Sequence, residues 1–299
     1  ASGFAFFAGC SEYEFKAQTD AELAGQDTAQ QLLDSGDPQD SAVDSDDPIV
    51  DTNGSEADSD LPVAVCDVSP NPVHPPFEDA TWDGTESYDP QGATITSYDW
   101  TLTSIPSGST SILAPNSGDT LSGFTPDLAG DYVAELVVTT DDGRVSDPCE
   151  VTLEAIPSQD LWIEMYWTTA NDDMDLHLLD DGGSVWADSD CHWLNCTPTY
   201  ASTGLPWGAS GPVDNPTLDL DDISGTGPEN INISSPDTVT FKVVVHDYPG
   251  SSYQPANDVT INIYMDGALE WTDTRAISGE DTFTEFAEID WSTGTVTDL

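Results

Sequence analysis

Two aspartates and a histidine alternate along one short stretch of the chain. Residues 173–178 read Asp-Met-Asp-Leu-His-Leu, so Asp173, Asp175 and His177 occupy every second position. Side chains two residues apart share one face of a β-strand, and the intervening apolar residues then face a core. Like charges this close repel one another unless a cation lies among them. The pattern predicts a cation-binding face on a strand.

Further acidic residues follow in a Gly-, Asn- and Asp-rich region, Asp180 to Ser235, which is expected to form long loops. Oxygen ligands in this number, beside turns that can bend around an ion, suit calcium with its roughly six to eight ligands. The EF-hand pattern is absent. The alternative is a solvated acidic face, since acids occur throughout the chain. The predicted calcium ligands are Asp173, Asp175, His177, Asp190, Asp219, Asp221, Asp222 and Glu229.

An enzyme is the second class to weigh. His177, His192 and His246 all fall in the C-terminal half and could form a three-histidine zinc hydrolase centre. The sequence contains neither His-Glu-x-x-His nor Gly-x-Ser-x-Gly. Paired carboxylates could hydrolyse glycosides, but nothing selects one pair among so many acids. We therefore expect a protein that is not an enzyme.

Aromatic residues in the same region suggest a third class, ligand recognition. Aromatic rings beside calcium-ordered loops are suited to binding sugars, so glycan binding is the alternative function. Trp193 stands between two cysteines and is expected to pack its own loop. The candidate ligand-binding aromatics are Trp186, Trp207, Tyr248 and Tyr253.

The charge balance excludes several partners. Among 299 residues there are 57 Asp and Glu against 4 Lys and Arg, a formal net charge of −53. Such a chain repels phosphate backbones and anionic headgroups, so neither nucleic-acid binding nor electrostatic docking to membranes is expected. Divalent cations, or a saline medium that screens the repulsion, fit this charge.

The elements that must position these residues are predicted to be strands. Period-two alternation at Thr94–Trp100 and Tyr132–Val138, between turn signals, predicts a β-sandwich over 61–157. A second sandwich or jelly roll is predicted over 159–299, with a hairpin turn at 265–268. Its expected strands are Leu161–Trp167, Met174–Leu179, Val239–His246, Val259–Met265 and Phe283–Trp291. The expected fold class is all-β, two sandwiches in tandem.

The five cysteines comprise one single residue and two pairs. Cys66 and Cys149 fall on the first and last expected strands of the first domain, which lie close in a sandwich, while Cys191 and Cys196 bound a short loop. We predict two disulfides within separate domains and hence an oxidising compartment. The alternative, a zinc site at Cys191 and Cys196 with His192, lacks the paired spacing of structural zinc motifs.

The fifth cysteine, Cys10, follows the apolar residues 1–9, which end in small side chains. Phe-Ala-Gly-Cys (7–10) resembles the lipobox of a lipoprotein signal peptide, which implies lipidation of Cys10. Residues 11–60 are rich in Asp, Ser and Pro and are predicted to form a disordered acidic tether. The expected location is the outer membrane or cell surface, with membrane contact only through the lipid.

Motifs across 61–157 resemble the PKD family of extracellular immunoglobulin-like domains. They are Asp-Gly-Thr-Glu-Ser-Tyr-Asp-Pro-Gln-Gly (83–92), Tyr-Asp-Trp (98–100), Phe-Thr-Pro-Asp (124–127) and Gly-Asp-Tyr (130–132). The resemblance implies a spacer or adhesive module rather than an enzyme.

Motifs across 159–299 resemble an uncharacterised bacterial domain family found in secreted and lipoprotein-type surface proteins. They are the segments 173–178, 190–193 (Asp-Cys-His-Trp), 214–222, 227–232 (Gly-Pro-Glu-Asn-Ile-Asn) and 244–248 (Val-Val-His-Asp-Tyr). The resemblance implies a surface protein and no particular reaction. The expected function is structural or adhesive, with a surface glycan or protein as partner.

Overall fold

The computed structural model describes residues 60–197, 205–208, 211–237 and 239–299. Cys10 and the expected tether, apart from Asp60, lie outside these residues. Sixteen strands occur in the described part of the chain and no helix, so the all-β fold class is confirmed. The strands are β1 (Asp67–Ser69), β2 (Ala80–Asp83), β3 (Ile95–Ser104), β4 (Thr120–Phe124), β5 (Gly130–Thr140), β6 (Cys149–Ala155), β7 (Leu161–Trp167), β8 (Met174–Leu179), β9 (Asp190–Cys191), β10 (Thr217–Leu220), β11 (Glu229–Ile233), β12 (Thr240–Asp247), β13 (Asn257–Met265), β14 (Ala268–Ile277), β15 (Thr282–Asp290) and β16 (Thr295–Asp298).

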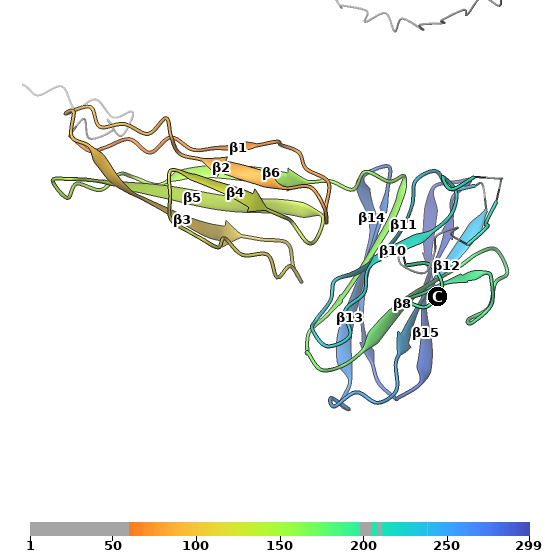
Figure 1. Ribbon diagram of the computed structural model, residues 1–299. Coiled ribbons are helices and arrows are strands. Elements are labelled where there is room, and N and C mark those ends of the chain that lie inside the picture. Colours follow the sequence, from red (N-terminus) through yellow and green to blue (C-terminus); the bar gives the residue numbers. More distant parts are fainter. Residues whose placement is uncertain (1–59, 198–204, 209–210, 238) are drawn as a thin grey trace, which may run out of the picture. The chain divides into compact units, whose positions relative to one another are not determined.

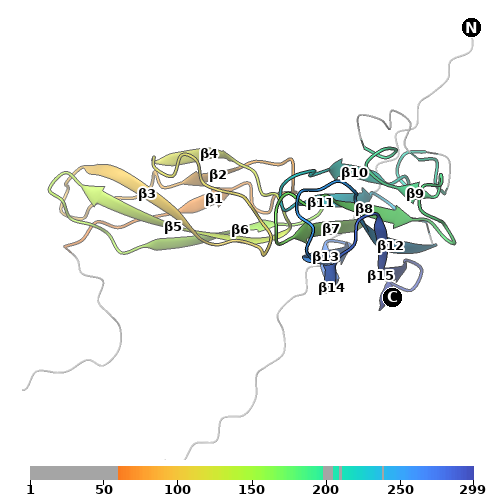
Figure 2. The same cartoon turned by 90° about the horizontal axis from the view of Figure 1, so that it is seen from below.

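The first sandwich consists of the antiparallel sheets β1-β2-β4 and β3-β5-β6. Figure 2 shows β3, β5 and β6 running side by side along this body. The predicted alternation in Tyr132–Val138 is confirmed, because every second residue of β5 is buried from Tyr132 onward. Trp82 and Trp100 meet in the core with ring centroids 6.1 Å apart, and Phe124 packs edge-on to Trp82 at 5.5 Å. Aromatic burial of this size stabilises a small sandwich.

The second sandwich pairs the antiparallel sheets β10-β11-β7-β13-β14 and β16-β15-β12-β8-β9 (Figure 1). The observed β7 and β8 have the predicted bounds. The predicted hairpin at 265–268 joins β13 to β14, with Asp266 and Gly267 both at positive φ (50° and 80°). That conformation at both central residues belongs to the tight turns that favour Asp-Gly.

The expectation of long loops between Asp180 and Ser235 needs correction, because β9, β10 and β11 lie within this region. All five residues of β11 are buried, including Glu229, Asn230 and Asn232. Buried strands are usually apolar, whereas Glu and Asn are typical of loops. The polar residues of β11 are the reason why its sequence predicted a loop.

Both predicted disulfides are present. Cys66 is bonded to Cys149 with their Cα atoms 5.9 Å apart, and Cys191 to Cys196 with 5.4 Å. Disulfides form and persist in oxidising compartments, so these two bonds indicate an extracytoplasmic location. The described residues include no helix that is long and apolar enough to cross a membrane.

Candidate metal centre

Three ionisable side chains are brought onto one face of a sheet by the pairing of β8 with β12. Asp175 lies opposite His246 in this register, and His177 lies opposite Val244. The other face of β8 carries Met174, Leu176 and Leu178, which belong to the hydrophobic core as predicted. Asp175, His177 and His246 are nevertheless only 3%, 0% and 1% exposed. The polar face is therefore covered as completely as the core face.

Aromatic rings cover this polar face. The Trp186 ring stands edge-on to His177 at 5.2 Å and to His246 at 5.5 Å between centroids. Phe283 is paired with His246 across β12 and β15, and their rings stack at 4.1 Å. His192 stacks on His177 at 5.1 Å. These rings exclude water from groups that would otherwise be solvated.

One nitrogen of His177 is fixed by Asp190. The His177 Nδ1 lies 2.9 Å from each carboxylate oxygen of Asp190, which is itself fully buried on β9. The Trp186 backbone N–H donates to the same carboxylate at 2.7 Å. Because the carboxylate accepts the Nδ1 proton, the lone pair remains on Nε2. That Nε2 is buried and has no hydrogen-bond partner.

His246 and Asp175 leave two further polar atoms without partners. His246 Nε2 lies 3.2 Å from the Asp281 carboxylate, whereas its Nδ1 lies 3.5 Å from Asp175 Oδ2, beyond ordinary hydrogen-bond length. Neither Nδ1 nor Oδ2 has a hydrogen-bond partner. Burial lowers the pKa of His246, but the negative charges of the nearby Asp175 and Asp281 carboxylates shift the pKa upward on balance.

A carboxylate group adjoins these histidines and shares Asp175 with them. Asp175, Asp221 and Glu229 each offer an oxygen within 4.8 Å of the others. Glu229 is fully buried on β11 of the opposing sheet, where its Oε2 accepts the Leu176 backbone N–H at 2.8 Å. Burial, reinforced by the negative charge of Asp175, raises the pKa of Glu229 well above its usual value.

Asp173 adds a fourth carboxylate just before β8. Its Oδ1 is buried and has no hydrogen-bond partner. Burial, followed by repulsion from Asp175 and Asp221, raises the pKa of Asp173 to about 7. Asp173, Asp175 and Asp221 line a cavity of about 220 Å³. Its other lining residues are Trp193, Ile223 and Tyr248.

The remaining predicted ligands lie elsewhere in the site. Asp190 supports His177 as described. Asp219 accepts a hydrogen bond from Asn232 Nδ2 at 2.8 Å. Asp222 accepts the backbone N–H groups of Gly225 at 2.8 Å and Gly227 at 2.9 Å, so its carboxylate holds the turn before β11. His246 is absent from the predicted calcium ligands, and the sequence suggested it only as one member of a three-histidine zinc centre with His177 and His192.

The predicted ligand-binding aromatics are placed differently from one another. Tyr248 lines the acidic cavity together with Trp193, their ring centroids 6.0 Å apart. Trp186 covers the histidines and is 47% exposed. Trp207 is buried and stacks on Phe241, so its ring is already engaged in the core. Tyr253 is partly buried, and its hydroxyl lies 3.5 Å from the Ala256 carbonyl.

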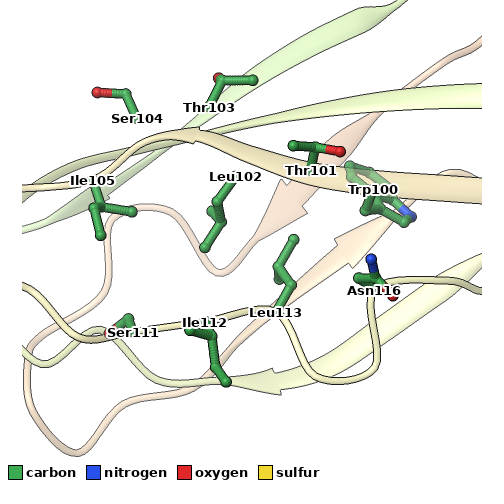
Figure 3. Close-up of a pocket in the computed structure, with 10 residues that line it drawn as sticks. All are labelled: Trp100, Thr101, Leu102, Thr103, Ser104, Ile105, Ser111, Ile112, Leu113 and Asn116. Carbon is green, nitrogen blue, oxygen red and sulfur yellow. The ribbon is translucent and has the colours of Figure 1, made fainter.

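A second cavity, of about 310 Å³, lies in the first sandwich along β3 (Figure 3). Leu102 and Leu113 point toward one another across it, while Thr103 and Ser104 lie on the opposite side of the strand. None of its lining residues is ionisable. This cavity therefore offers no acid, base or charged ligand.

No family model, curated protein or solved structure matches this chain.

Proposed function

We propose that the chain is an extracytoplasmic surface protein with a structural or adhesive role and a calcium-stabilised second sandwich. One observation carries this proposal: the carboxylates of Asp175, Asp221 and Glu229 converge within 4.8 Å. Like charges so close, two of them buried, destabilise the folded chain unless a cation neutralises them. Asp175 and Glu229 lie on strands of the two facing sheets, β8 and β11, so an ion held between them would join the sheets, which suits a stabilising role.

Neutralisation by a lysine or arginine side chain is not available among the described residues. Lys242 pairs with Glu285 at 2.8 Å and Arg275 with Asp273 at 2.7 Å. Arg144 belongs to the first sandwich, where it pairs with Asp89 and Asp142. Apart from a proton on His246, the neutralising charge must therefore come from solution. Oxygen donors in a set of three or four, with an adjoining cavity for water, suit calcium better than softer metals.

Calcium binding to the full chain tests the proposal directly. Asp221→Asn removes one converging oxygen charge, so we expect calcium affinity to fall by about tenfold or more in calorimetric titration. Asp219→Asn, two residues away and engaged with Asn232, is the matched control and should leave the affinity within about twofold. Equal affinities for the two variants would count against a site at Asp221.

Glycan binding is a second candidate, favoured by one observation. Trp193 and Tyr248 line the same cavity as the acidic side chains, so a sugar could stack on a ring while its hydroxyls contact a bound ion. We expect binding on a glycan array in calcium and none in chelator. Trp193→Ala should abolish it, and Tyr253→Ala should not. An array without calcium-dependent signals would leave the structural role.

The remaining parts of the proposal concern attachment. We propose that Cys10 carries a lipid, that residues 11–60 act as a tether, and that the PKD-like first sandwich serves as a spacer. When the full-length gene is expressed in a bacterial host, labelled fatty acid should become covalently attached to the protein. The Cys10→Ala protein should instead be found in the soluble fraction. Continued membrane association of Cys10→Ala would contradict the anchor.

A further inference from the structure

We infer that the second sandwich also binds a zinc-type transition-metal ion through His177 Nε2, His246 Nδ1 and Asp175 Oδ2. These ligand groups offer atoms that lie within 4.8 Å of one another. This site differs from the calcium site in its donors, because two of its three ligands are imidazole nitrogens. Imidazole is a preferred ligand of zinc and related ions and a poor one for calcium.

The absence of hydrogen-bond partners is the independent observation. His177 Nε2, His246 Nδ1 and Asp175 Oδ2 are all buried and all without a hydrogen-bond partner. Leaving a buried polar atom unpaired costs roughly 1–3 kcal/mol, and more for a charged group. Because the three side chains offer ligand atoms within 4.8 Å of one another, a single cation could accept a lone pair from each of them.

A protonated His246 paired with Asp175 is the competing explanation. It would satisfy Nδ1 and Oδ2, although their separation of 3.5 Å is long for such a bond. It would leave His177 Nε2 unpaired, because the Nδ1 proton of His177 is already donated to Asp190. An ion pair thus accounts for two of the three atoms, and a metal ion accounts for all three.

Asp190 supplies the support that a metal-binding histidine requires. A histidine that ligates a metal through one nitrogen usually donates its other N–H to a carboxylate or carbonyl, which fixes the ring and its tautomer. Asp190 does this for His177, and Asp281 lies against His246 Nε2 in the corresponding position. Three protein ligands leave one position of a tetrahedral zinc ion for water.

The test is zinc binding by the full chain, measured by competition with a chromophoric chelator. We expect one zinc ion per chain. His246→Gln should weaken its affinity more than tenfold, because a lost ligand costs at least as much as a lost supporting partner. His192→Gln is the matched control: it replaces the third histidine, which stacks on His177 but offers no atom to the group, and zinc affinity should persist. Excess calcium should leave the zinc bound.

Two measurements keep the test independent of folding and of the calcium proposal. Cobalt(II) bound to the unmodified chain should show visible absorption and X-ray absorption features of two imidazole nitrogens. Asp221→Asn should lose calcium and keep zinc, whereas His246→Gln should lose zinc and keep calcium. The inference would be overturned if Asp221→Asn lost zinc while His246→Gln retained it, or if the cobalt spectrum showed no nitrogen ligands. So would the failure of the unmodified chain to bind zinc.

Discussion

Replacing Glu229 by Gln is expected to stabilise the metal-free protein and to abolish its response to calcium. Glu229 is fully buried and its pKa is raised by burial and by Asp175, so its charged form destabilises the folded state. Gln keeps an oxygen that can accept the Leu176 N–H without the charge. In chelator at pH 8, Glu229→Gln should therefore melt above the unmodified chain.

Calcium should reverse this order. A ligand that binds only the folded state raises the free energy of unfolding by about 2.7 kcal/mol at a hundredfold excess over Kd. For a domain of this size, that corresponds to a rise of several degrees in melting temperature. The unmodified chain should show this rise and Glu229→Gln should not. Glu288→Gln, on an exposed position of β15, is the matched control and should respond as the unmodified chain does. A Glu229→Gln protein that melts lower in chelator and still responds to calcium would contradict the assignment.

Burial and repulsion among these carboxylates also determine how the stability of the metal-free protein depends on pH. Because the pKa of folded Asp173 is raised to about 7, the unfolded chain releases this proton first as the pH rises. The folded state then binds more protons than the unfolded one, so stability falls between about pH 4 and pH 7. Glu229 acts in the same direction. In chelator, melting temperature should decrease across this range, and calcium should reduce the decrease.

Removing the Cys66–Cys149 disulfide is expected to cause the largest loss of stability. The bond closes a separation of 83 residues, for which chain entropy gives roughly 4.5 kcal/mol as an upper value. The Cys191–Cys196 bond spans a separation of only 5, for which the same relation gives roughly 2 kcal/mol. Denaturant unfolding of the paired serine variants measures both.

Each double-serine variant serves as the control for the other. The Cys66→Ser and Cys149→Ser pair should lose more stability than the Cys191→Ser and Cys196→Ser pair, and the first sandwich should carry the loss. The reverse order would show that the short bond stabilises by holding the loop over His177 rather than by restricting the unfolded chain.

The alternation of β8 illustrates how far sequence alone can lead. Period two placed Asp175 and His177 on one face and the apolar residues in the core, and the structure confirms that division. The pattern could not show that His246 lies opposite Asp175, because the register of two distant strands depends on tertiary pairing. Local spacing identifies a face, and only the fold identifies what completes it.

Two adjacent aspartates show the other limit. Asp221 belongs to the carboxylate group, whereas the Asp222 carboxylate holds a turn through backbone N–H groups. Composition treats the two alike, since both are acids in a Gly-rich segment. The direction of each side chain is set by the turn into β11. That strand was predicted as a loop because of its buried Glu and Asn residues.

Anomalous diffraction from crystals of the full chain grown with calcium would locate the bound ion. We expect a calcium peak between the carboxylates of Asp175, Asp221 and Glu229, at about 2.3–2.6 Å from their oxygens. A structure at millimolar calcium with no peak among these three residues, or with calcium bound only at exposed acids elsewhere, would rule out the proposed calcium site.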